Sequence, residues 1–308
     1  MMRPPVALGR RVLRHGLGEI LSAACALVWA VAVILFRRSG DHTPPVALNF
    51  FKVMVGLVLA LLTLPFTSSL SLMNQYPAMD WLVLVASGVV GMGVADSLFF
   101  AGLNRIGAGR TAVLDSLYSP AVILWSFMLL DEPIGPAILL AMALMAFATA
   151  LGSTGARGTR HGDLKVGVVL GLIAILLMAL SVVFAKPVLD RWDAWLATTV
   201  RLAGGASFLC AQAFLPRYRQ DTLRILRPGP AWRHALLGSV LGSYVAMFLW
   251  IFGLKYTWTT TASVLNQTSN LWIILFASIF LREPLGPRQY AAVLLGFGAA
   301  WLAAAAGG

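Results

Sequence analysis

The chain has 308 residues, of which 59% are hydrophobic and 11% are charged, whereas roughly 25% of the residues in an average soluble domain are charged. A soluble protein of this length has no core large enough for so much apolar surface, so the composition excludes an ordinary globular enzyme, a disordered chain and a secreted disulfide scaffold. It predicts a protein that crosses a membrane several times. The net charge of +11 lies mostly between apolar runs, where anionic lipid head groups meet the chain, and does not indicate a nucleic-acid partner.

The N-terminal segment has part of the pattern of a targeting signal. Four arginines, the last of them Arg14, precede the first apolar run. However, Glu19 interrupts the start of that run, and no convincing A-x-A cleavage motif follows it. We therefore expect the segment to be retained as the first transmembrane helix.

Ten apolar runs follow one another along the chain, and each can cross a bilayer once, since a spanning helix needs about 20 residues. The expected spans are 16–36, 45–65, 81–103, 107–130, 134–152, 166–187, 194–215, 234–254, 258–281 and 287–306. Alternating strand-type patterns are absent, and the longest polar connection, Pro216 to Arg233, is expected to be only a loop. The predicted fold class is an all-α integral membrane protein without a soluble domain.

The sequence contains an internal repeat. Residues 102–136 and 253–287 superpose with a shift of 151 residues, and a shift of 149 relates earlier parts of the two units. Matched positions include Gly102 with Gly253, Glu132-Pro133 with Glu283-Pro284, and Lys52 with Arg201. The units, 16–152 and 166–306, hold five predicted helices each, and this odd number forces them into opposite orientations. The prediction is therefore ten transmembrane helices as two inverted five-helix repeats, the design of secondary transporters whose substrate site lies between the halves.

These two features, the repeated turn motif and the repeated basic residue, make the chain resemble EamA-type members of the drug/metabolite transporter superfamily. The motif runs from Gly-Leu through a small-residue helix to an acidic-Glu-Pro turn, Asp131-Glu132-Pro133 and then Arg282-Glu283-Pro284. The resemblance covers about residues 16–306. It implies export of amino acids, other small metabolites or drugs, often driven by a proton gradient, and it does not identify the substrate.

Four ionisable residues lie well inside predicted spans, namely Lys52, Asp96, Asp115 and Arg201. A charge at the centre of a bilayer costs about 2.5–3.5 kcal/mol on insertion scales, so such residues normally face the bundle interior or a water-filled cavity. Lys52 and Arg201 occupy equivalent positions in the two units. This symmetry suits a structural role as well as a contact for a substrate carboxylate, and the sequence leaves both interpretations open.

The two buried carboxylates occur only in the first unit, because Met247 and Asn266 stand at the positions equivalent to Asp96 and Asp115. Proton coupling needs a group that titrates during transport, and a low dielectric disfavours the charged form of a carboxylate. Asp96 and Asp115 are therefore the candidate proton-coupling residues. The alternative is a neutralising salt bridge to one of the two buried basic residues.

A polar stripe follows one face of the predicted ninth helix. Its members are Thr259, Ser263, Asn266 and Asn270, with Gln267 beside them. Such side chains would lack partners in lipid, so they are expected to line a cavity, the alternative being helix–helix hydrogen bonds. The equivalent face in the first unit carries Asp115 and Ser119, with Tyr118 beside them.

Aromatic residues at mid-span positions could complete a pocket, although ordinary packing explains them equally well. The expected substrate contacts are Trp29, Lys52, Tyr118, Arg201, Tyr244, Asn266, Gln267 and Asn270. The tryptophans near span ends, Trp192 among them, are expected to be interfacial anchors. Pro120 interrupts the fourth predicted helix, and since its counterpart is Leu271, any kink there should belong to one unit only.

No motif indicates an enzyme, a metal site or a cofactor. Cys25 and Cys210 lack metal-ligand spacing and are expected to be small core residues, and the four histidines form no HxxxH or HExxH pair. A GxSxG motif with His and a P-loop are absent as well, which argues against intramembrane hydrolysis and against ATP-driven transport by this chain.

The resulting prediction is a secondary active transporter of the inner (cytoplasmic) membrane that exports small metabolites such as amino acids, coupled to protons. A multidrug or toxic-compound exporter and a non-transporting membrane scaffold are the alternatives, and a homodimer is among the assemblies left open. Two signals disagree about the side of the membrane on which the N-terminus lies. With a cytoplasmic N-terminus, as the resemblance implies, cytoplasmic segments would hold 7 basic residues and external segments 14, against the positive-inside rule.

Overall fold

The computed structural model describes residues 5–40, 44–106, 114–132, 134–152, 164–227, 229, 232–281 and 286–307. Within these ranges the chain is helical and contains no β-strand. Seven described segments are long and apolar enough to cross a membrane, namely Gly16–Phe36, Val46–Phe66, Ala78–Phe99, Leu164–Arg191, Trp232–Tyr256, Thr259–Phe280 and Pro287–Ala306. Two shorter apolar helices are Tyr118–Leu130 and Pro136–Leu151. The prediction of an all-α membrane protein is confirmed.

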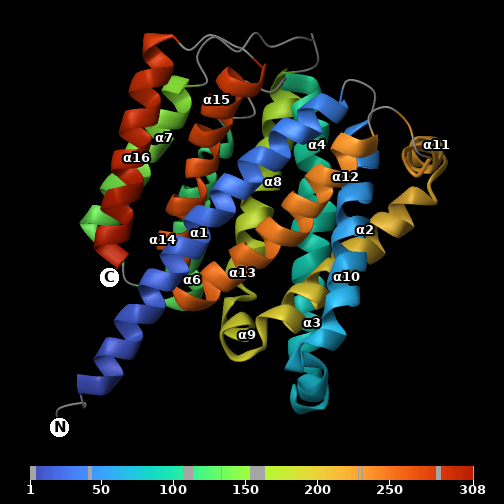
Figure 1. Ribbon diagram of the computed structural model, residues 1–308. Helices are drawn as coiled ribbons and strands as arrows, with labels where there is room; N and C mark the ends of the chain where they lie inside the picture. Colours follow the sequence, from blue (N-terminus) through green and yellow to red (C-terminus); the bar gives the residue numbers. More distant parts are fainter. Residues whose placement is uncertain are drawn as a thin grey trace.

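The helices of the first half largely follow the predicted spans. They are α1 (Pro5–Gly40), α2 (Pro45–Thr63), η1 (Leu64–Phe66), η2 (Ser68–Gln75), α3 (Ala78–Gly88), η3 (Val89–Ala95), α4 (Asp96–Ile106), α6 (Tyr118–Leu130) and α7 (Pro136–Gly152). α1 begins well before the predicted start at residue 16, and its first turns project from one end of the bundle (Figure 1).

The second half repeats this order with more interruptions. Its helices are α8 (Leu164–Val183), α9 (Lys186–Arg191), α10 (Ala194–Ala213), α11 (Pro216–Ile225), α12 (Trp232–Ser239), η4 (Val240–Ala246), α13 (Met247–Tyr256), α14 (Thr259–Asn266), α15 (Thr268–Leu281) and α16 (Pro287–Gly307).

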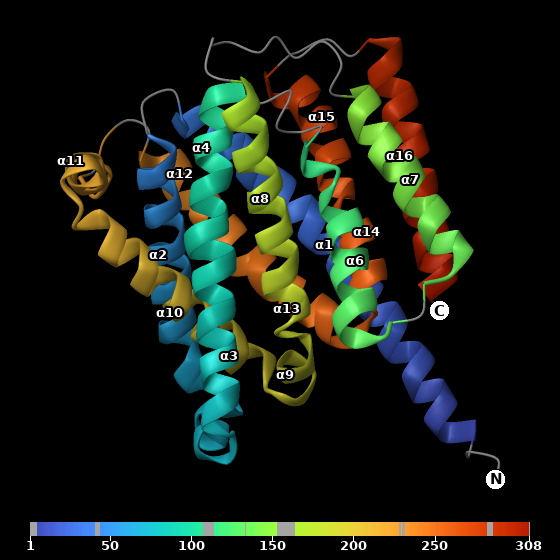
Figure 2. The ribbon, with the colours of Figure 1, turned by 180° about the vertical axis from the view of Figure 1, so that it is seen from behind.

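The two halves interleave. α1 packs against α12, α13, α14 and α15, whereas α8 packs against α4 and α6. The last helices of the halves, α7 and α16, run along each other at one side of the bundle (Figures 1 and 2). α1 begins and α16 ends toward the same end of the bundle, where α9 also lies, and α11 lies toward the opposite end (Figure 1).

Glycines let α3 and α10 cross with their backbones in contact. A Cβ atom at Gly88 would lie 1.9 Å from the carbonyl oxygen of Arg201, and one at Gly204 would lie 2.4 Å from the carbonyl oxygen of Val85. Only hydrogen fits as a side chain at either position. This crossing brings the middle of α10, and Arg201 with it, into the core between the halves.

Both halves contain a π-helix at the same place. The π-helices are η3 and η4, which coincide under the shift of 151 residues found in the sequence. Each lies inside a spanning segment, η3 between α3 and α4 and η4 between α12 and α13. π-Helical turns are rare and are frequently found at functional sites. Their recurrence indicates a feature that both repeats require.

A second matched irregularity shows that the prediction of a kink in only one half is wrong. α6 begins after a turn at residues 116–117, and α15 begins after a turn at Gln267. In the first half, Pro120 removes a backbone donor and so weakens the helix. In the second half no proline stands at the equivalent place. There the Gln267 side chain instead donates its amide to the backbone carbonyl of Asp115, 2.8 Å away, so the two interrupted helices meet.

The prediction that residues 216–233 form only a loop is also wrong, because α11 occupies the first part of that segment. Pro216 suits the first turn of a helix. Thr222 and Ile225 are buried, and Ile225 packs with residues of α2 and α12 such as Phe51 and Ala235. These contacts stabilise a helix whose own sequence is mostly polar.

Glu132, from the Glu-Pro turn of the first half, caps a helix of the second half. Its two carboxylate oxygens accept hydrogen bonds from the backbone N–H groups of Thr259 (3.0 Å) and Thr260 (3.2 Å), at the start of α14. Glu132 is 6% exposed. A carboxylate here satisfies two helix-terminal donors and is favoured by the helix dipole. The matching Glu283, with Pro133 and Pro284, lies outside the described residues.

Replacing Glu132 by alanine should destabilise the purified protein, because two buried N–H groups would lose their acceptor. An unsatisfied buried donor costs about 1–3 kcal/mol, so the loss should be visible as a lower unfolding temperature, followed by circular dichroism in detergent.

Asp131→Asn is the matched control for this substitution. Asp131 is exposed and has a left-handed φ of 50°, a conformation that asparagine tolerates, so this variant should unfold like the wild type. Equal losses in the two variants would contradict the capping role of Glu132.

Candidate functional site

Lys52 and Asp96 form an ion pair inside the bundle. The Nζ atom of Lys52, on α2, lies 3.1 Å from Oδ2 of Asp96, at the start of α4, and the two side chains are 10% and 19% exposed. The ammonium group also lies 5.5 Å from the ring centroid of Trp29, within the range of a cation–π contact. The opposite charges compensate each other, which is the neutralising alternative that the sequence left open for Asp96.

Asp115 has amide partners instead of a cation. Nδ2 of Asn270 donates to Oδ2 of Asp115 (3.2 Å) and to Oε1 of Gln267 (2.9 Å), while Nε2 of Gln267 donates to the Asp115 backbone carbonyl (2.8 Å). Among the described residues Asp115 makes no salt bridge. The predicted polar faces of the two halves therefore meet, and they do so where both helices are interrupted.

Arg201 is a buried charge that forms no salt bridge with the described residues. It is 3% exposed on α10, and its Nε and Nη1 atoms have no hydrogen-bond partner in the described part of the chain. The repeat explains this difference, since Met247 stands where the first half has Asp96, the partner of Lys52. A buried charged donor without a partner is costly. The position of Arg201 therefore suits an anionic group of a bound molecule.

The other predicted contacts differ in their surroundings. Tyr118 lies near Arg201 and packs against the same core cluster as Trp29. Asn266 ends α14, and its Oδ1 is buried without a partner among the described residues. Tyr244 lies in η4 and packs edge-on against Phe248, with ring centroids 5.1 Å apart. Tyr244 is therefore held by aromatic packing, whereas Tyr118 lies beside an unpaired charge.

Side chains that the sequence did not single out as functional hold carbonyls of the two π-helices. Nδ2 of Asn49 donates to the carbonyl oxygen of Met92 in η3, and the Cys25 thiol donates to that of Ala246 in η4, both at 3.2 Å. Cys25, expected only as a small core residue, therefore has a hydrogen bond as well. These two contacts could not be predicted, because the sequence gives no sign of a π-helix. Asp96 directly follows η3, so this segment sets the position of the acid.

A second ionic cluster, also missed from the sequence, lies near α9. Asp80 of α3 accepts hydrogen bonds from Arg191 Nη2 (2.5 Å), Arg191 Nε (2.9 Å) and Trp192 Nε1 (2.8 Å). Trp192 is 0% exposed and stacks on Tyr76 with ring centroids 4.1 Å apart. The prediction that Trp192 is an interfacial anchor is wrong, because Asp80 and Tyr76 bury it. The cluster joins the two halves at that end of the bundle.

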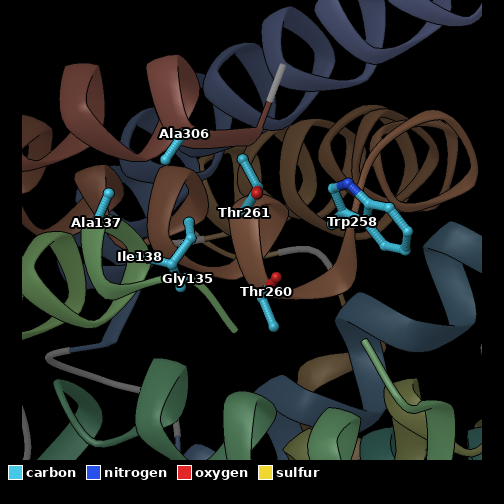
Figure 3. Close-up of a pocket in the computed structure, with 7 residues that line it drawn as sticks. All are labelled: Gly135, Ala137, Ile138, Trp258, Thr260, Thr261 and Ala306. Atoms are coloured by element: carbon cyan, nitrogen blue, oxygen red, sulfur yellow. The ribbon is translucent and has the colours of Figure 1, made fainter. Parts of the chain in front are cut away.

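A cavity of about 320 Å³ lies between α7, α14 and α16 (Figure 3). Its lining residues are Gly135, Ala137, Ile138, Trp258, Thr260, Thr261 and Ala306. None of the predicted site residues lines it, and Thr260 is one of the two donors to Glu132. The cavity therefore belongs to the capped start of α14 and is distinct from the charged residues described above.

Comparison with known proteins gives the family. The model of the EamA-like transporter family matches residues 16–154 and, a second time, residues 165–305. The chain belongs to the EamA-like transporter family. A solved crystal structure superposes on it with a TM-score of 0.76 at 16% sequence identity, covering 93% of this chain and 96% of that one. That structure shares the fold.

This EamA family member is similar to two further proteins. Protein PecM of Dickeya dadantii (strain 3937) is 26% identical over 261 residues, which cover 82% of this chain and 84% of PecM. A riboflavin transporter of Rhizobium johnstonii (strain DSM 114642 / LMG 32736 / 3841) is 36% identical over 93 residues, 30% of this chain and 29% of that protein. Together with the family match, these relatives make the chain a membrane transporter and not an enzyme.

Breaking the Lys52–Asp96 pair of this EamA transporter should destabilise it more than removing both charges. Breaking a buried ion pair costs about 3–5 kcal/mol, whereas replacing both partners by apolar groups is often neutral. We expect Asp96→Leu and Lys52→Met to unfold at lower SDS concentration than the wild type, and the double variant to recover most of the loss. Additive losses would show that the pair has no coupling energy.

Proposed function

We propose that this chain is a proton-coupled exporter of small metabolites, with amino acids as the first substrates to test. The observation that carries the proposal is the Arg201 guanidinium, buried between the halves with two nitrogens unpaired among the described residues. A guanidinium binds a carboxylate through two parallel charge-assisted hydrogen bonds. The carboxylate of an arriving substrate would therefore supply the partner that the fold leaves out.

We infer a ten-helix architecture of two inverted units, 16–152 and 166–306. The seven spanning segments together with α6, α7 and α10 would account for ten helices. Inversion is supported by α1 and α16 reaching the same end of the bundle (Figure 1), and by the π-helix and the interrupted helix that recur in each half. Discontinuous helices at a repeat interface commonly form the substrate site of secondary transporters. The inner (cytoplasmic) membrane is the proposed location.

The acid and amides at the two helix interruptions would bind the other end of an amino acid. Asp115 offers a carboxylate for an ammonium group, while Asn266, Gln267 and Asn270 offer neutral donors and acceptors. Trp29, Tyr118 and Tyr244 would contact the remaining side chain, and Lys52 would supply a second cation. A zwitterion would thus be oriented between Arg201 and the Asp115 cluster.

Asp115 and Asp96 are the proposed proton-coupling residues. Asp115 makes no salt bridge among the described residues, so it could take up and release a proton during the cycle without breaking an ion pair. Protonation of Asp96 would instead release Lys52 from the pair at 3.1 Å. Substrate binding and proton binding would then compete for the same charged groups, which is what coupled exchange requires.

An exporter of aromatic or toxic compounds is the second candidate. Trp29, Tyr118 and Trp250 belong to one core cluster, and flat aromatic molecules stack well on such rings. The partial match to a protein named riboflavin transporter favours the same class. A non-transporting scaffold would be indicated by a protein that exchanges no compound. Export as the direction of transport stays a prediction, and so does assembly into a homodimer.

Arg201→Gln should weaken amino-acid exchange, because the substrate carboxylate would lose a charge-assisted hydrogen bond. Such bonds are worth about 1.5–3 kcal/mol, which corresponds to roughly ten- to hundredfold weaker binding. The measurement is uptake of labelled amino acids by proteoliposomes loaded with unlabelled substrate. Arg288→Gln, at an exposed position of α16, should exchange like the wild type. Unchanged exchange by Arg201→Gln would exclude Arg201 as the carboxylate contact.

Asp115→Asn should keep exchange but lose the response to a pH gradient. Asparagine has nearly the same size and can still hydrogen-bond to Asn270, but it carries no exchangeable acid proton. Accumulation of labelled substrate is compared with and without an imposed gradient, with the exposed Asp131→Asn as control. A variant that still accumulates substrate with the gradient would remove Asp115 from the proton pathway and leave Asp96 as the candidate.

A further inference from the structure

α11 lies at the outer edge of the bundle, near the end where α10 ends and α12 begins, as both views of the ribbon show (Figures 1 and 2). Just before it, Phe214 and Leu215 are 82% and 52% exposed. Apolar side chains exposed beside the end of a spanning helix lie near the boundary between lipid acyl chains and head groups. The position of α11 is therefore that of a helix at the membrane interface.

One face of α11 fixes it to the bundle. Tyr218, Thr222 and Ile225 follow one another at helical spacing, and Thr222 and Ile225 are 4% and 9% exposed. Ile225 shares a core cluster with Ala47, Leu48 and Phe51 of α2 and with Ala235 of α12. α11 is thus packed against the ends of two spanning helices and keeps a set orientation.

A second face of α11 is apolar and exposed. Leu223 and Leu226, three residues apart, are 53% and 49% exposed. Arg219 lies one turn before Leu223 on the same side. Exposed leucines next to an arginine with a long flexible stem are typical of a helix whose side chains reach from acyl chains to head groups.

The remaining face is basic. Its residues are Arg217, Gln220 and Arg224, and Arg227 follows just after the helix end; all four are exposed. With Arg219 and the single acid Asp221, residues 216–227 carry a net charge of +3. The salt bridges among the described residues include none of these arginines. A positive surface is therefore presented to whatever lies against this end of the bundle.

We propose that α11 is an interfacial helix whose arginines bind the phosphodiester head groups of anionic phospholipids. Arginine matches the geometry of phosphate oxygens, and a juxtamembrane basic segment is attracted to an anionic leaflet. The exposed leucines favour a lipid over a water-soluble anion, because only a lipid surface would cover them. Binding would anchor the C-terminal end of α10, the helix that carries Arg201.

The test uses the full-length protein in nanodiscs of phosphatidylcholine with and without phosphatidylglycerol, in a buffer that contains inorganic phosphate. Retained lipids are counted by native mass spectrometry, and the unfolding temperature is followed in parallel. We expect the wild type to retain phosphatidylglycerol preferentially. The combined variant Arg217→Gln, Arg219→Gln, Arg224→Gln and Arg227→Gln should lose roughly fivefold of that preference per arginine.

Two control variants test whether the effect depends on positive charge and on its position in α11. The same four positions changed to lysine should keep most of the preference, and Arg233→Gln with Arg288→Gln, exposed positions outside α11, should keep it as well. A four-glutamine variant with wild-type preference for phosphatidylglycerol would overturn the proposal.

Depth measurements keep the proposal testable if the combined variant folds poorly. Nitroxide labels at Leu223→Cys and Gln220→Cys are introduced after Cys210→Ser, while Cys25 is 5% exposed and is left in place. The label at position 223 should be relaxed mainly by oxygen in the bilayer, and the label at 220 mainly by a water-soluble nickel complex. Equal exposure of both labels to nickel would place α11 in water, as for a soluble anionic partner, and would overturn the proposal.

Discussion

The cost of an unpaired charge inside a bilayer governs the centre of this bundle. In the first half, Lys52 and Asp96 compensate each other at 3.1 Å. In the second half, Met247 replaces the acid, and Arg201 is held in the core by the glycine crossing of α3 and α10 although two of its nitrogens lack partners among the described residues. The bundle thus contains a buried charge without hydrogen-bond partners for these two nitrogens. Binding of a transported anion would explain why such a residue is present.

The two halves agree in backbone geometry and differ in chemistry. The π-helices η3 and η4 and the interruptions before α6 and α15 recur at equivalent places. The acids beside them do not recur, since Met247 and Asn266 stand at the positions equivalent to Asp96 and Asp115. Shared irregularities suit a motion that both halves undergo, whereas the unmatched residues are the ones proposed here to bind substrate and protons.

Features that depend on residue type and spacing could be predicted from the sequence. Long apolar runs predicted the spanning helices. The polar faces that carry Asp115 and Asn270 were also visible, because they lie on equivalent helices of the two units, and the structure joins them by a hydrogen bond. The pairing of Asp96 with Lys52 was open, since two buried cations were available. The Asp80 contacts with Arg191 and Trp192 join residues 111 and 112 positions apart. Such contacts, like the π-helical pitch, leave no periodic signal in a single sequence.

The cap on α14 has a consequence for how the chain is made. Glu132 and its donor Thr259 are 127 residues apart, so the carboxylate is synthesised long before the helix that it caps. Until then the Glu132 carboxylate lacks its two native donors. Neither unit therefore has all its native hydrogen bonds by itself. The first unit reaches its native structure only when α14 has been synthesised and donates its N–H groups to Glu132.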